Sequence, residues 1–83
     1  MNTIVQFRLR QEGGDVRWKS PRIYEPHETP EYPEIGTTVS PPESVGGSDC
    51  TVTEITEVVQ QEVNDGPKVT VITVILRRLP KSH

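Results

Sequence analysis

The sequence predicts a mainly β protein, and its composition and two strand-like segments carry that prediction. The chain of 83 residues has no alanine and only three leucines, whereas valine, isoleucine and threonine are abundant. Branched side chains suit a pleated strand, and alanine and leucine are the best helix formers. We expect a small sheet or barrel of two antiparallel hairpins, joined by a long proline-rich arm, within a single domain over residues 1–83.

The first predicted hairpin consists of two alternating segments around a pair of glycines. Apolar and polar residues alternate over residues 3–11 and again over residues 16–19, which is typical of half-buried strands. Gly13 and Gly14 between them suit a two-residue turn, because glycine accepts a positive φ. That turn would create three cross-strand pairs: Leu9 with Trp18, Arg10 with Arg17, and Arg8 with Lys19.

The polar face of this hairpin is basic. Like charges that lie directly opposite each other destabilise a strand pair, so we expect a compensating factor. Solvation, cover by acidic groups of the chain, or a bound anion such as a nucleotide could each supply it. No aromatic ring interleaves on that face and the net charge is −3, so nucleic acid is disfavoured as a partner. The candidate anion-binding residues are Arg8, Arg10, Arg17 and Lys19.

Residues 25–50 form the predicted arm, which is rich in proline and poor in large apolar residues. Within it, glutamates recur every third residue, which matches the roughly 3 residues per turn of a polyproline II helix. In that conformation the carboxylates would lie on one ridge. A solubilising loop is the plainer alternative to a surface that binds a protein partner. The candidate partner-binding residues are Glu25, Glu28, Glu31, Tyr32 and Glu34.

Residues 51–63 fit a strand or a helix. A capping-box pattern over residues 51–54 and the spacing of Val52, Ile55 and Val59 favour a helix. The many threonines and valines favour a strand, and this is the reading we adopt. The alternative is an α+β fold of ββαβ type, with a helix over residues 51–63.

Residues 68–79 are apolar on both faces, which predicts a strand that is covered on both sides. Such a strand is either central in its sheet or part of a subunit interface. Its two predicted faces are Ile72, Val74 and Leu76 on one side, and Val69, Val71 and Ile75 on the other. The second face supplies the candidate residues of an oligomer interface.

Several classes of function lack support in the sequence. Only His27 and His83 could act as imidazole bases, and no nucleophile or phosphate-binding motif accompanies them. One histidine beside Glu25 and Glu28 falls short of the ligand count of a zinc site, so we expect no metal and no cofactor. Cys50 is the single cysteine, which suits a reducing cytoplasm. The chain shows no signal-peptide pattern, and its longest apolar run is too short for a membrane span.

These observations favour a non-enzymatic protein-binding or assembly module. A core this small leaves little net stability, so we expect a homo-oligomer. Size and the lack of a catalytic set suit an accessory or inhibitor protein of a phage or bacterium. One alternative is a small anion- or nucleotide-binding protein that uses the basic hairpin face. The other is a structural subunit of a larger particle.

Overall fold

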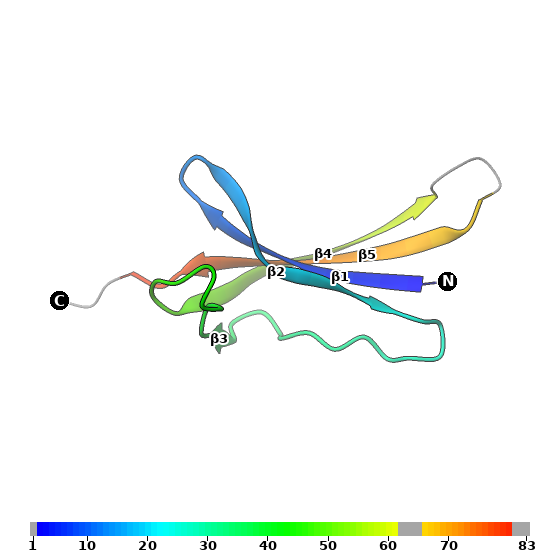
Figure 1. Ribbon diagram of the computed structural model, residues 1–83, viewed down its shortest axis with the longest axis horizontal. Coiled ribbons are helices and arrows are strands. Elements are labelled where there is room, and N and C mark those ends of the chain that lie inside the picture. The colour runs from blue at the N-terminus through cyan, green and yellow to red at the C-terminus, as the bar shows by residue number, and fades with distance from the viewer. Residues whose placement is uncertain (1, 62–65, 81–83) are drawn as a thin grey trace.

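The computed structural model describes residues 2–61 and 66–80, and all the regular structure in these residues is strand (Figure 1). The mainly β prediction is therefore confirmed. The alternative with a helix is wrong for residues 51–61, which are extended, and residues 62 and 63 lie outside the described residues. No helix in the described residues could cross a membrane. The strands are β1 (Asn2–Gln11), β2 (Gly14–Tyr24), β3 (Thr38–Val39), β4 (Cys50–Gln61) and β5 (Lys68–Arg78).

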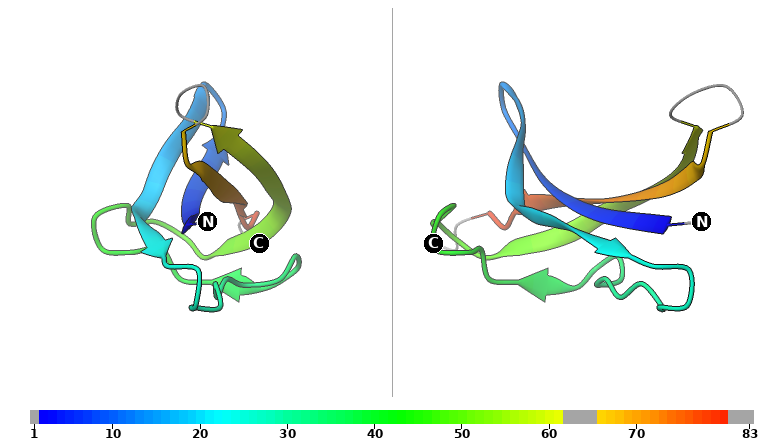
Figure 2. Two further views of the ribbon diagram at one scale, coloured as in Figure 1. Left: turned by 90° about the vertical axis from the view of Figure 1, so that its right-hand side faces the viewer. Right: turned by 45° about the vertical axis from the view of Figure 1, so that its right-hand side comes forward.

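The strands form one mixed sheet in the order β2-β1-β5-β4-β3. The hairpins β1–β2 and β4–β5 are antiparallel, and so is the short pair β3–β4. The two hairpins join through the parallel pair of β1 and β5, so the first and the last strand lie side by side in the sheet. The sheet is strongly curled into a half-barrel, and residues 25–39 run along its open side (Figure 2).

The inner face of the curled sheet carries the core. Alternate residues of β1 point inward, and their parallel partners on β5 do the same, with Val5 beside Ile72 and Leu9 beside Leu76. The predicted central position of residues 68–79 is confirmed, because β5 pairs on both sides. The buried residues of the core cluster are Val5, Phe7, Leu9, Trp18, Tyr24, Cys50, Val52, Ile72, Val74 and Leu76.

The first hairpin forms as predicted, but in a different register. Gln11 pairs with Gly14, so Glu12 and Gly13 are the turn residues. Leu9 therefore lies opposite Val16 instead of Trp18. Further along the hairpin, Arg10 pairs with Asp15, Arg8 with Arg17, and Phe7 with Lys19. This register replaces one repulsive arginine pair with an attractive pair, and two irregularities in β1–β2 pairing between Val5 and Arg8 absorb the offset.

A bulge in β4 explains why residues 51–63 also fit a helical pattern. The pairing with β5 shifts between Val52 and Glu54, so the strand gains an extra residue at Thr53. Val52 and Ile55 consequently both point inward although they are three residues apart. A spacing of three is characteristic of a helix, and a bulge reproduces it in a strand. The hydroxyl of Thr53 donates a hydrogen bond of 3.4 Å to the carbonyl of Ile75.

Residues 25–49 contain only β3 as regular structure, and backbone hydrogen bonds attach them to the sheet. Gly36 donates to the carbonyl of Val52 at 2.8 Å, and Val52 donates to the carbonyl of Thr37 at 3.0 Å. At the start of the segment, the amide of Glu28 donates to the carbonyl of Glu25 at 3.0 Å. This turn is incompatible with a polyproline II helix, which has no internal hydrogen bonds. The expected single ridge of four glutamates is therefore wrong at its first turn.

Candidate functional site: the outer face of the sheet

The outer face of the sheet, opposite the core, is divided into three zones along the strands. One end carries arginines near the β1–β2 turn. A polar row follows. In it, the side-chain amide of Gln6 donates a hydrogen bond of 2.8 Å to the hydroxyl of Thr73, and Thr73 lies beside Thr56. Beyond this row the outer-facing residues become apolar. The sheet therefore presents a charged surface and an apolar surface on one side.

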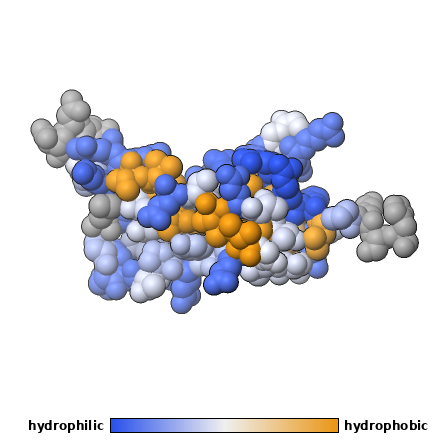
Figure 3. Space-filling model, turned by 180° about the vertical axis from the view of Figure 1, so that it is seen from behind, coloured by the Kyte–Doolittle hydropathy of each residue, from blue (hydrophilic) through white to orange (hydrophobic). Residues whose placement is uncertain are grey.

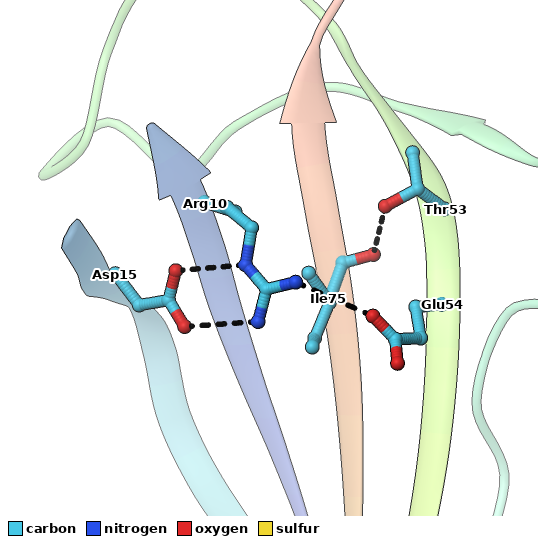
Figure 4. A network of polar contacts seen from close by, with 5 residues as sticks. All are labelled: Arg10, Asp15, Thr53, Glu54 and Ile75. Carbon is cyan, nitrogen blue, oxygen red and sulfur yellow. Dashed lines mark hydrogen bonds and ion pairs between the residues drawn. The ribbon is translucent and has the colours of Figure 1, made fainter. Parts of the chain in front are cut away.

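Arg10 organises the charged end. Its guanidinium donates to both carboxylate oxygens of Asp15, at 3.1 and 3.4 Å, and to Glu54 at 3.3 Å (Figure 4). The hydrogen bonds from Arg10 hold the pKa of Asp15 below its ordinary value, and the charges of Arg10, Arg8 and Arg77 act in the same direction. In turn, Asp15 and then Glu54 raise the pKa of Arg10. Three strands, β2, β1 and β4, thus share one ionic network.

The network reaches across β5 at Ile75. Arg10 on β1 and Glu54 on β4 meet over this residue, and Ile75 is only 5% exposed although it belongs to the outer face (Figure 4). Ile75 was one of the candidate interface residues. Its cover comes from within the chain, so its burial requires no second subunit. Val69 and Val71, the other two candidates, are half-buried on the same face.

The remaining basic residues separate into two groups. Arg8 and Arg17 lie directly opposite each other and are exposed, whereas Asp15 and Glu54 both bind Arg10. Lys19 lies elsewhere: it is opposite Phe7, with its Nζ 4.2 Å from the centre of that ring. The structure therefore brings three of the four candidate anion-binding residues together, namely Arg8, Arg10 and Arg17, and places Lys19 against the core aromatics.

Four strands contribute one residue each to an apolar row across the other end of the outer face. The pairing places Ile4 between Ile23 and Val71, and Val71 beside Val58. Ile23 is 62% exposed and Val58 51% exposed. Seen from behind, the molecule shows hydrophobic patches on its surface with hydrophilic residues between and around them (Figure 3). We call Ile23, Ile4, Val71 and Val58 the apolar row.

The candidate residues of the arm lie in the segment that follows β2, outside the strands. Glu25, Glu31, Tyr32 and Glu34 face solvent, and Tyr24 anchors the segment by donating its hydroxyl to the carbonyl of Glu31 at 3.3 Å. Glu25, His27 and Glu28 offer ligand atoms that all lie within 4.8 Å of one another. The imidazole and the Glu25 side chain are largely exposed, and such clusters are common without an ion.

The side chain of Cys50 is buried, and its thiol lies 3.6 Å from the carbonyl of Ser48. It has no histidine neighbour among the contacts of the described residues, so the geometry offers no activating base.

Sequence reasoning missed three of the four members of the apolar row. Val71 was identified, but Ile4, Ile23 and Val58 lie on segments where the inward residues dominate the pattern. Their relation emerges only from the register of three strand pairs. Comparison with known proteins finds no matching family model, no matching curated protein and no matching solved structure.

Proposed function

We propose that this chain is a non-enzymatic protein-binding and assembly module, with the outer face of the sheet as its contact surface. The apolar row is the observation that carries the proposal. Two of its four members are more than half exposed, and they lie on strands at opposite sides of the row. Contiguous exposed apolar surface rimmed by polar residues is characteristic of protein interaction sites.

The energetics support contact through this row. Apolar surface that leaves water contributes roughly 25 cal/mol per Å². The flanking polar row of Gln6, Thr73 and Thr56 supplies a rim that remains compatible with solvent. A small core with little stability to spare also gains from association, because a partner that binds only the folded state stabilises it. Homo-oligomer formation in a reducing compartment, with Cys50 kept as a thiol, belongs to this proposal.

The experiment that tests the proposal replaces Ile23 with lysine and measures the mass of the particle by sedimentation velocity. Ile23→Lys places a charge in the apolar row, so association should weaken by at least tenfold. Ile35→Lys is the matched control, because Ile35 is 63% exposed and lies outside the sheet. A parent protein that sediments as a monomer at every concentration, or equal effects of the two variants, would overturn the proposal.

Arg8 and Arg17 favour a second candidate function, the binding of a phosphate-bearing anion. Two guanidinium groups directly opposite each other repel, and an anion between them would relieve that repulsion. Titration calorimetry with a nucleoside triphosphate at low salt should then show heat that Arg8→Gln removes and Lys19→Gln preserves. Binding should weaken as the salt concentration rises. Absence of heat in the parent protein at low salt would eliminate this candidate.

A further inference from the structure

We propose that the open edge of β4 pairs antiparallel with β4 of a second copy, about a two-fold axis at Val58. The inference goes beyond the proposed contact through the outer face, because it adds a contact at the edge of β4 and names a second copy of this chain as the partner there. It joins two half-barrels into one continuous sheet. Three features of β4 carry it: a free edge, exposed valines on both faces, and a self-complementary register.

The edge of β4 is covered only at its beginning. β3 pairs with Cys50 and Thr51, and Gly36 and Thr37 bond to Val52. From residue 53 to residue 61, the described part of the chain supplies no strand on that side. A row of unpaired N–H and C=O groups is a template for another strand, so the geometry of the edge selects an extended partner.

The opposite edge of the sheet is protected. β2 contains Pro21, which lacks a backbone N–H, and its pairing with β1 is irregular on both sides of Phe7. Proline and bulges on an edge strand prevent pairing with a further strand. Residues 53–61 contain neither proline nor glycine. A contact between β4 and β2 of different copies is thus disfavoured, and β4 with β4 gives a closed, two-fold dimer.

Neighbouring valines on β4 are exposed on both faces of this edge. Val58 points to the outer face and is 51% exposed, whereas Val59 points to the inner face and is 56% exposed. A partner that covered only one face of the sheet would leave one of them in water. A strand added at the edge contacts both, because its own side chains alternate between the faces.

One register pairs the uncovered part of β4 with its own copy and also extends the apolar row. A two-fold axis at Val58 pairs Val58 with its own copy, Glu57 with Val59, and Thr56 with Gln60. The apolar row then continues from Val58 of one copy into Val58 of the second. An axis at Glu57 would set two glutamates opposite each other, and an axis at Thr56 would set Val58 against Glu54, so both are less favourable.

The size of the contact sets its strength. In this register only residues 55–61 of each copy pair. A standard interface has roughly 20–30 residues on each side, so this contact is small. We therefore expect a dimer that forms and dissociates with protein concentration. Antiparallel partners on one face have Cβ atoms about 4.5–5.5 Å apart, which is within reach of a disulfide or close to it.

Disulfide trapping tests the register directly. Val58→Cys should form a covalent dimer under mild oxidation, because the two-fold axis brings the two thiols together. Thr56→Cys and Gln60→Cys are matched controls on the same face of the same strand. Each lies four residues from its own copy in this register, or roughly 13 Å, which exceeds the limit of about 7 Å for a disulfide. The parent protein controls for Cys50, and mixing the two control variants should restore a cross-link between them.

The outcomes separate this inference from the proposed function. A covalent dimer of Val58→Cys, with at least tenfold less from Thr56→Cys or Gln60→Cys alone, supports the edge dimer. Trapping by Thr56→Cys alone, or no trapping at concentrations where the parent sediments as a dimer, overturns it. In the second case the proposed function still stands if Ile23→Lys dissociates that dimer and Ile35→Lys does not.

Discussion

At the scale of single residues, Arg10 has the most consequential position in the molecule. It neutralises Asp15, reaches Glu54, and together with Glu54 covers Ile75 on the outer face. The network therefore covers one end of the outer face with side chains of the chain itself. Where Arg10 closes over β5 the sheet is covered by its own side chains, and where the network ends the apolar row is open.

The first prediction concerns Asp15. Arg10→Gln should raise the pKa of Asp15 toward the ordinary value of about 3.9, because the largest cause of its lowered pKa is the hydrogen bond from Arg10. Carboxyl titration by NMR measures this change, with Lys19→Gln as the control. An unchanged pKa of Asp15 in Arg10→Gln would contradict the network.

The same lowered pKa predicts how stability depends on pH. A carboxyl group whose pKa is lower in the folded state stabilises the fold above its unfolded pKa, and that contribution is lost as the pH falls through the folded pKa. The parent should therefore lose stability below about pH 4, and Asp15→Asn should lose less over the same range. Urea unfolding at several acid pH values measures the difference, and parallel losses in both proteins would refute the expectation.

A further prediction concerns the core. Leu76→Ala should lower the free energy of unfolding by about 2–5 kcal/mol, because the side chain is fully buried and the neighbouring strands can close the cavity only in part. Ile35→Ala, at an exposed site, should change it by less than about 0.5 kcal/mol. Denaturant unfolding compares the two variants, and similar losses would show that the inner face is not the core.

At the scale of elements, the sequence predicts the strands well and their relations poorly. The alternation in residues 3–11 and the two-faced run in residues 68–79 identified β1 and β5 because each pattern is local. The register of the first hairpin depends on the pair Arg10–Asp15 and on two irregularities near Phe7. No local sequence pattern indicates either feature. The bulge at Thr53 produced a helical spacing within a strand.

The candidate site was predictable only in part for the same reason. The basic end followed from local alternation, with Lys19 placed incorrectly by the shifted register. The apolar row depends on the parallel pairing of β1 with β5, strands that are separated by most of the chain. Val71 was identified from the pattern of its own strand. Ile4 and Ile23 are recognised as its neighbours only once that pairing is known.

The connection between β3 and β4 gives a prediction at this scale. Gly47 has φ +88°, and Arg78 on β5 packs against it while donating to the carbonyls of Gly46 at 2.9 Å and Ser48 at 3.3 Å. Gly47→Ala combines an unfavourable φ with a clash against the guanidinium, so it should cost about 1–3 kcal/mol. Thermal or urea unfolding measures the loss.

Gly36→Ala is the comparison for that variant. Gly36 also has a positive φ, of 95°, but an added Cβ there meets nothing within 4 Å. Its loss should be smaller than that of Gly47→Ala, because backbone strain acts alone. Equal losses would mean that Arg78 contributes nothing to holding the loop.

At the scale of the whole molecule, the structure is elongated, with extents of 54 × 27 × 21 Å. The arginine end and the apolar row lie at different positions along the same outer face, and we expect contacts through them to respond differently to salt. Contacts between exposed charges are screened at high ionic strength, whereas burial of apolar surface is not. Salt therefore separates assembly through the apolar row from recognition through the arginines.

The most direct test of the central claim is light scattering coupled to size exclusion, on the parent protein at low and at high salt. Assembly through the outer apolar row predicts an oligomer whose mass is maintained, at equal protein concentration, when the salt concentration rises. A monomer at both salt concentrations, or an oligomer that dissociates in high salt, would contradict that claim and direct attention to Arg8 and Arg17.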